Sequence, residues 1–118
     1  MKEKDIKNFI DDLKKTSHLE LKIKGCRDNA PRPLRYYNSK KLFVPDVEVN
    51  YKNKRDFYVF EALINKDDIA LLTFKWILFA AEARKLNGEF HLVVDNSNYI
   101  FCKKVVFDKQ LELVLIKI

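Results

Sequence analysis

The pattern of apolar and polar positions predicts helices and strands that alternate along the chain. Residues 3–15 place apolar side chains at helical spacing in an otherwise charged segment, which predicts an amphipathic helix. Residues 18–24 alternate between apolar and polar, which predicts a half-exposed strand with Leu19 on its inward face. Residues 25–39 contain Gly25 and two prolines, which indicates a loop.

Residues 43–64 predict a β-hairpin. The first strand alternates apolar and polar side chains, and the second is a run of bulky apolar residues that contains one acid. The stretch between them is polar and includes an asparagine, a residue that tolerates the positive φ of a hairpin turn. A two-residue loop at Asn53 and Lys54 would pair Lys52 with Arg55 and set the register of both strands.

That register places Asp46 directly opposite Glu61. The Cβ atoms of directly opposed residues lie roughly 5 Å apart, and like charges in such positions are destabilising. A divalent cation would compensate the two carboxylates, because hard cations bind carboxylate oxygens. The hairpin therefore predicts a metal site at Asp46 and Glu61.

Residues 66–87 carry the strongest helical pattern in the chain. Asn65 is a favourable N-cap, and Asn87 followed by Gly88 is a favourable C-terminal stop. The helix is apolar on nearly all sides, which predicts that it is buried on both sides or faces a partner. A homodimer through this helix is therefore one of the expected arrangements.

Lys75 is the only charged residue between Ile69 and Ala81 of this helix. Its neighbours one turn away are all apolar, so the side chain either reaches solvent through a gap or serves a function. A partly buried ammonium group is costly unless an anion compensates it. Asp46 and Glu61 are the nearest plausible acids.

The C-terminal third is expected to add strands to a sheet. Residues 89–95 alternate as a strand, and residues 95–98 are polar and predict a turn. Residues 99–102 and 111–118 predict further strands, although the last segment also fits a helix. A strand–helix–strand crossover favours an α/β (α+β) fold, with a mixed central sheet flanked by helices in one domain over residues 1–118.

The composition favours a globular protein with an anionic partner. Of the 118 residues, 47% are hydrophobic and only two are glycine, which is unlike a disordered chain. The net charge of +6 favours nucleic acid as a partner, although solvated lysines give the same composition. The two cysteines lie far apart without a CxxC pair, the first residues are charged, and no apolar run has membrane-spanning length. These features predict a cytoplasmic protein.

Basic and aromatic side chains are concentrated between the first strand and the hairpin. Such a mixture can hold phosphates and stack on bases, so this segment is a candidate nucleic-acid-binding surface. The alternative is that the tyrosines cover the edge of the core and the basic side chains are solvated. The candidate residues are Arg27, Arg32, Arg35, Tyr36, Lys40 and Lys41.

The hairpin and the helix after it resemble the PD-(D/E)XK superfamily of metal-dependent nucleases. Pro45 and Asp46 match the first part of its motif, and Glu61 matches the acid on the next strand. The resemblance implies a restriction-endonuclease-like core in which the two acids bind Mg²⁺ or Mn²⁺. It also implies a lysine two positions after the acid, where this chain has Leu63. Some members carry this lysine on the following helix instead, which implies a catalytic role for Lys75.

The leading hypothesis is a metal-dependent nuclease that hydrolyses phosphodiester bonds in DNA or RNA. Asp46 and Glu61 would hold the metal, and Glu48 would assist them. Lys75 would stabilise the charge of the transition state or orient the attacking water. The alternative is a catalytically inactive nucleic-acid-binding or assembly module that keeps the nuclease fold, which Leu63 favours. A third hypothesis, a dimerisation subunit, depends on the apolar helix.

Overall fold

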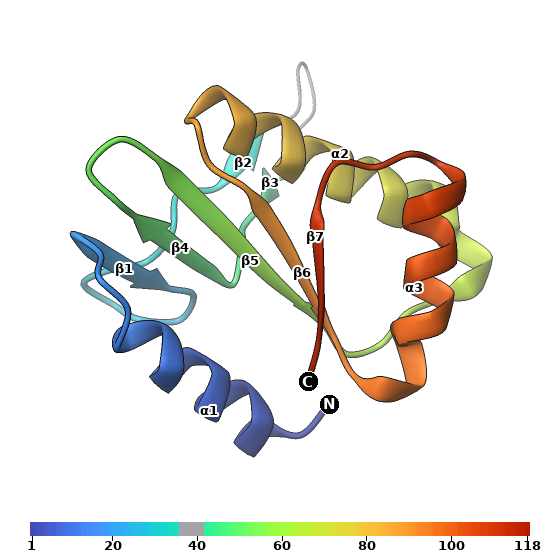
Figure 1. Ribbon diagram of the computed structural model, residues 1–118, viewed down its shortest axis with the longest axis horizontal. Helices are drawn as coiled ribbons and strands as arrows, with labels where there is room; N and C mark the ends of the chain where they lie inside the picture. The colour runs from blue at the N-terminus through green and yellow to red at the C-terminus, as the bar shows by residue number, and fades with distance from the viewer. Residues whose placement is uncertain (36–41) are drawn as a thin grey trace.

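The computed structural model describes residues 1–35 and 42–118 and contains three α-helices packed on a five-stranded mixed sheet (Figure 1). The helices are α1 (Glu3–Lys14), α2 (Ile69–Lys85) and α3 (Asn96–Asp108), and a 3₁₀ turn, η1 (Lys66–Asp68), precedes α2. The strands are β1 (Glu20–Ile23), β2 (Leu34–Arg35), β3 (Leu42–Phe43), β4 (Val47–Asn50), β5 (Arg55–Glu61), β6 (Phe90–Val94) and β7 (Val114–Lys117). The expected α/β fold, a mixed sheet flanked by helices, is confirmed.

The strands of the main sheet follow the order β1-β4-β5-β6-β7. Neighbouring strands are antiparallel from β1 to β5 and parallel from β5 to β7. Parallel neighbours need a long crossover connection, and α2 and α3 provide the two crossovers. Because β5, β6 and β7 run in the same direction, their carboxyl ends meet at one edge of the sheet, which we call the carboxyl edge (Figure 1).

Helices cover both faces of the main sheet. On one face, Phe9 and Leu13 of α1 pack on Tyr58 and its neighbours, and the ring centroids of Phe9 and Tyr58 lie 5.7 Å apart. On the other face, α2 and α3 bury the larger core. The α1 face buries Leu13, Val47, Val49, Tyr58 and Val93, and the α2–α3 face buries Phe57, Val59, Trp76, Phe79, Phe90, Leu92, Val94 and Cys102.

The first helix and the first strand form as expected, but Leu19 does not face inward. This residue precedes β1, and its side chain is 74% exposed rather than inward. Its backbone N–H donates to the carbonyl oxygen of Asn50 (2.9 Å), so the backbone is held at the edge of the sheet while the side chain stays in solvent. The segment expected to be a loop also contains β2, which pairs Leu34 with Phe43.

The hairpin forms, but its register differs by two residues from the expected one. Asn50 pairs with Arg55, and the N–H of Tyr51 donates to the carbonyl oxygen of Lys54 (2.8 Å). The loop therefore contains the four residues from Tyr51 to Lys54 rather than two. The ammonium group of Lys54 lies over the ring of Tyr51, 4.6 Å from its centroid, a contact made across this longer loop. A two-residue offset leaves every side chain on its expected face, because strand side chains alternate with a period of two.

Local sequence determines both ends of the helical segment that contains α2. The side-chain oxygen of Asn65 accepts a hydrogen bond from the N–H of Asp67 (3.0 Å), as expected of an N-cap. At the other end, Asn87 adopts a φ of 61°, and the next N–H donates to a carbonyl in the last turn of α2. Gly88 is required for a second reason, because a Cβ atom at this position would clash with the carbonyl oxygen of Arg55.

The structure corrects the prediction of a turn at residues 95–98 and of a strand at residues 99–102, because α3 begins at residue 96 and runs through both segments. The side chain of Asp95 accepts a hydrogen bond from the N–H of Asn98 (3.2 Å) and caps the helix. A bulky apolar run as short as residues 99–102 fits a strand and a buried helix equally well. β6 and β7 are parallel neighbours, and the chain can join them only by a crossover connection. Residues 99–102 lie in that connection, where they form part of α3.

The strands expected at residues 89–95 and 111–118 are confirmed as β6 and β7. Within residues 1–35 and 42–118, no helix combines the length and the apolar character that crossing a membrane requires.

Candidate active site

Glu61 and Lys75 form an ion pair at the carboxyl edge. Glu61 is the last residue of β5 and is 7% exposed, and its Oε1 also accepts a hydrogen bond from Nε1 of Trp76 (3.4 Å). Lys75 comes from the first half of α2, and its side chain is 25% exposed. The structure thus supplies the acid that the apolar surroundings of Lys75 require, because a largely desolvated ammonium group needs a compensating anion.

Asp46 lies just before β4 and interacts with the same pair of charges. Its Oδ2 accepts a hydrogen bond from the N–H of Phe60 (2.7 Å). Burial raises the pKa of Asp46, and the negative charge of Glu61 adds to the rise. The Phe60 N–H and the positive charges of Lys24 and Lys75 oppose it, but the net pKa is raised. The carboxylate form of Asp46 is therefore less favourable than it is in water, and a further positive charge beside it would stabilise that form.

The strand offset corrects the predicted position of Asp46 relative to Glu61. In the observed register Val47 pairs with Tyr58, so Glu61 extends past the paired part of β4. The expectation that Asp46 lies directly opposite Glu61 is wrong, because the hairpin loop is two residues longer. The two carboxyl groups nevertheless share one electrostatic environment, since the charge of Glu61 raises the pKa of Asp46. Lys75 acts on both groups.

Asp46 also borders a hollow of about 260 Å³ between α1 and the start of β4. Most of the lining side chains are apolar, and Lys24 and Asp46 are the charged ones among them. A polar ligand in the hollow would therefore meet both charges. The lining residues are Ile6, Ile10, Ile23, Lys24, Asp46 and Phe60.

Leu63 stands two positions after Glu61, where the resemblance implies a lysine. The strand β5 ends at Glu61, and Leu63 lies beyond it with 92% of its surface exposed. A lysine at this position would extend into solvent rather than along the strand toward Glu61. In this fold the cation reaches Glu61 from α2 instead, through Lys75.

Glu48 interacts with β1 rather than with Asp46 and Glu61. Its carboxylate is 1% exposed, lies 3.7 Å from Nζ of Lys22 and accepts a hydrogen bond from Nδ2 of Asn50 (3.3 Å). In the part of the chain that the structure describes, no group of three or more His, Cys, Asp or Glu side chains is placed to hold a metal ion. The predicted third carboxylate is thus not brought to the other two.

A metal site at Asp46 and Glu61 stays a prediction, and the structure relates the two carboxyl groups through the effect of Glu61 on the pKa of Asp46. Mg²⁺ keeps several waters and is usually bound through one or two carboxylates, so two acids are sufficient. Burial is the main cause of the raised pKa of Asp46, and a cation bound beside it would favour the carboxylate form. These two residues would hold Mg²⁺ or Mn²⁺. Lys75 is paired with Glu61, and its positive charge lowers the pKa of Asp46.

His91 lies in a second polar cluster on the α1 face, away from the end of β5. It pairs with Tyr58, and the two rings stack with centroids 4.2 Å apart. Nε2 of His91 lies 3.7 Å from Oδ2 of Asp56. Asp56 is 3% exposed and also accepts a hydrogen bond from the N–H of Glu89 (2.8 Å). The cluster thus links β5 to the start of β6.

We expect Asp56→Asn to lower the free energy of unfolding at neutral pH. Burial raises the pKa of Asp56, but the adjacent His91, the Glu89 N–H and the charge of Lys54 outweigh burial and hold the pKa below its ordinary value. A carboxylate with a lowered folded-state pKa stabilises the fold above its unfolded pKa, and this stability is lost as the pH falls through the folded pKa. Urea unfolding of both proteins between neutral pH and about pH 2 should show a flatter acid limb for the variant. Identical acid limbs would contradict the assignment, and the exposed Asp12→Asn serves as the control.

The predicted nucleic-acid-binding segment is described only in part. Arg27 and Arg32 are exposed in the connection between β1 and β2, and Arg35 belongs to β2. Tyr36, Lys40 and Lys41 lie outside the described residues. Binding of nucleic acid through this segment stays a prediction.

Sequence reasoning missed the role of Trp76 beside the ion pair. Trp76 is fully buried, and its indole N–H is one of the groups that hold Glu61. A buried tryptophan usually has a hydrogen-bond acceptor for its indole N–H. The tryptophan next to Lys75 in the sequence therefore indicated that a second donor could reach the same acid.

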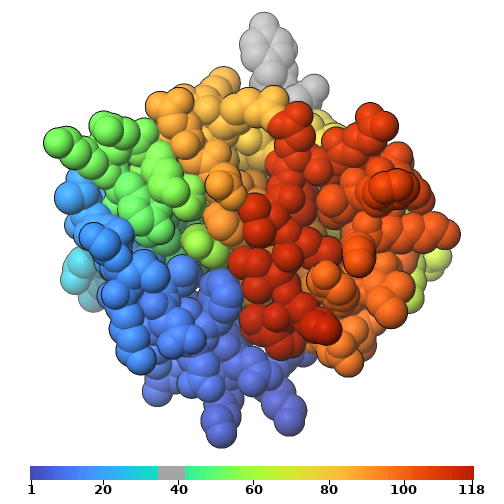
Figure 2. Space-filling model, in the orientation of Figure 1, coloured from blue at the N-terminus to red at the C-terminus, as the bar shows by residue number. Residues whose placement is uncertain are grey.

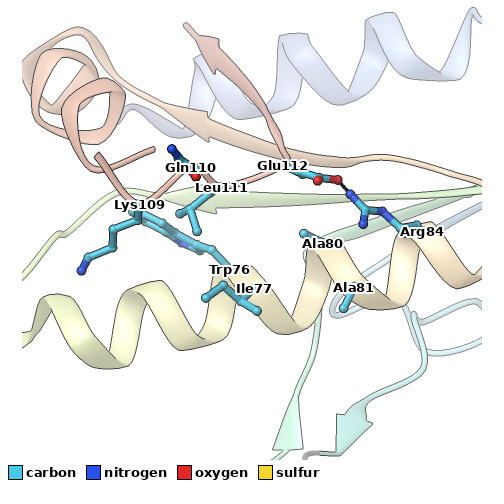
Figure 3. A pocket seen from close by; sticks show the side chains of 9 residues that line it. All are labelled: Trp76, Ile77, Ala80, Ala81, Arg84, Lys109, Gln110, Leu111 and Glu112. Carbon is cyan, nitrogen blue, oxygen red and sulfur yellow. Dashed lines mark ion pairs between the residues drawn. The ribbon is translucent and has the colours of Figure 1, made fainter. Parts of the chain in front are cut away.

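A groove of about 250 Å³ separates α2 from the segment between α3 and β7 (Figure 3). The ion pair of Arg84 with Glu112 spans it, and Ile77, which is 50% exposed, lines it. Trp76, Phe79 and Ala83 of α2 are buried within the chain, whereas Leu71 and Ile77 are 40% and 50% exposed. The homodimer through this helix stays a prediction. The lining residues are Trp76, Ile77, Ala80, Ala81, Arg84, Lys109, Gln110, Leu111 and Glu112.

Comparison of the chain with protein-family models, with curated proteins and with solved structures finds no match. The resemblance to the PD-(D/E)XK nucleases therefore depends on Pro45, Asp46, Glu61 and Lys75 and on the order of the elements that carry them.

Proposed function

We propose that the chain is a metal-dependent nuclease with a restriction-endonuclease-like core that hydrolyses phosphodiester bonds in DNA or RNA. The observation that supports this most is the ion pair between Lys75 and the buried Glu61, next to an Asp46 carboxyl group whose pKa is raised. Two acids and one lysine are the groups that the nuclease resemblance implies.

Each residue of the proposed site has a distinct role. Asp46 and Glu61 would hold Mg²⁺ or Mn²⁺, which supplies Lewis acidity and a more acidic bound water. Trp76 holds Glu61 in place through its indole N–H. Lys75 brings positive charge to the point where negative charge grows on the phosphate. The net charge of +6 favours approach of a polyanionic substrate.

The alternative is a catalytically inactive module that binds nucleic acid or assembles with partners. The feature that favours it is Leu63, which stands where the nuclease motif has a lysine. Metal-dependent hydrolysis and metal-independent binding separate the two proposals. The free thiols of Cys26 and Cys102 support an intracellular location for either one.

We expect Mn²⁺ to raise the melting temperature of the wild type and Asp46→Asn to abolish that rise. A ligand that binds only the folded state stabilises it by about 2.7 kcal/mol at 100 times its Kd. The raised pKa of Asp46 means that its carboxylate opposes folding as the pH rises through that pKa, so Asp46→Asn should be more stable than the wild type at neutral pH without metal. An asparagine oxygen can still accept the Phe60 N–H. Thermal unfolding in Mn²⁺ and in EDTA measures both effects.

Glu48→Gln is the matched control for this experiment. Because Glu48 is paired with Lys22, its variant should keep the Mn²⁺-induced rise in melting temperature. A wild type whose melting temperature does not respond to Mn²⁺ would contradict a metal site at Asp46 and Glu61. Loss of the response in Glu48→Gln would instead restore Glu48 as a third ligand.

A further inference from the structure

Three exposed lysines next to the candidate active site hold their ammonium groups over aromatic rings. Nζ of Lys66 lies 5.0 Å from the ring centroid of Phe101. Nζ of Lys117 and Nζ of Lys103 lie 5.1 Å and 6.0 Å from the ring centroid of Tyr99. Among the described residues none of the three lysines forms an ion pair with a carboxylate, so their charges remain uncompensated by acids within residues 1–35 and 42–118.

The register of the parallel strands places Lys117 in one row with Glu61. Glu61 pairs with Val94, and Val94 pairs with Lys117, so the three residues share the α2–α3 face of the sheet. Two strand spacings separate Glu61 from Lys117, which is roughly 10 Å. Figure 2 shows the C-terminal segment, in red, exposed on the surface between α1 and α3. Lys117, the last residue of β7, is exposed at the same edge of the sheet as Glu61.

The first turns of α3 bring the remaining members of the cluster to this edge. Nδ2 of Asn98 donates to the carbonyl oxygen of Ala62 (3.4 Å), which ties the start of α3 to the end of β5. Tyr99 follows Asn98 directly in α3, and the ammonium groups of Lys103 and Lys117 lie over its ring. Lys66, from η1, approaches α3 from the other side at Phe101. The three lysines, which are distant in sequence, therefore all contact the first turns of α3, the helix whose start is tied to the end of β5.

The aromatic rings restrict where the ammonium groups lie without neutralising them. A cation over a ring face gains about 0.5–1 kcal/mol at exposed sites, which is enough to bias a flexible side chain but not to hold it against a phosphate. Lysine is a point charge with rotatable donors, so it binds phosphate oxygens without reading bases. Such a cluster suits the backbone of a nucleic acid strand of any sequence.

We propose that Lys66, Lys103 and Lys117 bind the phosphodiester backbone of the strand that is cleaved at Asp46 and Glu61. This inference rests on the proposed nuclease function and names the path of its substrate. A strand advances about 3.4 Å per nucleotide along a helix axis, so the distance from Glu61 to Lys117 corresponds to about three nucleotides. The contacts are independent of base sequence.

Binding of labelled single-stranded DNA and RNA oligonucleotides in EDTA tests this path without requiring cleavage. Fluorescence anisotropy would compare the full wild-type chain with the triple variant Lys66→Gln, Lys103→Gln and Lys117→Gln. We expect Kd to rise about 30-fold for the triple variant, and the slope of log Kd against log salt to fall by about two, because single strands contribute about 0.7 per neutralised phosphate. Oligonucleotides of different sequence should give the same loss.

A second triple variant controls for the change in net charge. Lys4→Gln, Lys7→Gln and Lys52→Gln remove three exposed lysines from α1 and the hairpin loop. Their effect on Kd should stay below about 3-fold. Equal losses in both triple variants, no binding by the wild type, or a loss found only in the pair Arg27→Gln and Arg32→Gln would overturn the proposed path. If the wild type binds through the three lysines but never cleaves with Mn²⁺, the proposed hydrolysis is wrong and the proposed binding path is retained.

Discussion

Lys75→Met is expected to abolish metal-dependent cleavage of DNA and RNA, with a loss of about 10²–10³-fold in the single-turnover rate. The ammonium group of Lys75 is paired with the buried Glu61, and its charge also acts on Asp46. Methionine keeps the volume of the side chain but supplies no charge and no donor. Negative charge that grows on the phosphate would then meet two carboxylates without their cation.

The same variant should also lose some stability, which has to be separated from the loss of activity. Breaking a fully buried pair costs about 3–5 kcal/mol, and the cost is lower here because the Lys75 side chain is 25% exposed and water screens the remaining charge. Adding Glu61→Gln to Lys75→Met removes the unpaired carboxylate and should recover part of the stability. It should not recover cleavage, because Glu61 would hold the metal.

Lys85→Met is the matched control for Lys75→Met on the same helix. The side chain of Lys85 is 75% exposed and pairs only with Glu82 among the described residues, so its loss should leave cleavage unchanged. Labelled substrate with Mg²⁺ or Mn²⁺ measures the rate, and circular dichroism measures the fold. If Lys75→Met cleaves as fast as the wild type, the assignment of Lys75 is wrong. If the wild type binds nucleic acid and never cleaves it, the inactive module replaces the nuclease.

Trp76→Ala is expected to cost about 3–5 kcal/mol in the free energy of unfolding. Trp76 is fully buried in the α2–α3 core, and domains of this size are stable by only about 5–15 kcal/mol. Truncation leaves a cavity beneath the groove and also removes the N–H that Glu61 accepts. The variant should therefore unfold at a lower temperature and at a lower urea concentration than the wild type.

Trp76→Phe separates the packing of Trp76 from its hydrogen bond. Phenylalanine keeps most of the ring but lacks the donor, and Glu61 keeps its ion pair with Lys75. We therefore expect a smaller loss, with about 0.5–1.5 kcal/mol from the lost hydrogen bond. Ile77→Ala is the neighbouring control and should cost less than about 1 kcal/mol, since Ile77 is half exposed. Urea unfolding with equal m-values measures all three. A Trp76→Ala cost no larger than that of Ile77→Ala would contradict the role of Trp76 in the core.

Several elements of this protein were determined by the sequence alone, because short-range physics is sufficient for them. The amphipathic period of residues 3–15 and the cap at Asn65 are local features, and both helices form where they indicate. The period of two in the hairpin placed every strand side chain on its correct face. The acids and the lysine of the candidate site were identified in the same way, from a motif and from a lone charge among apolar residues.

Only the tertiary structure decided the features that depend on contacts between distant residues. The hairpin register was settled by the four-residue loop from Tyr51 to Lys54, whose conformation depends on contacts that residue preference does not specify. Residues 99–102 fit a strand or a helix locally, and the parallel pairing of β6 with β7 made them helical. The pairing of Glu48 with Lys22, of Glu61 with the indole of Trp76, and of Lys117 with Tyr99 required the sheet and its helices to be in place, because long-range contacts form only when the whole fold brings the side chains together.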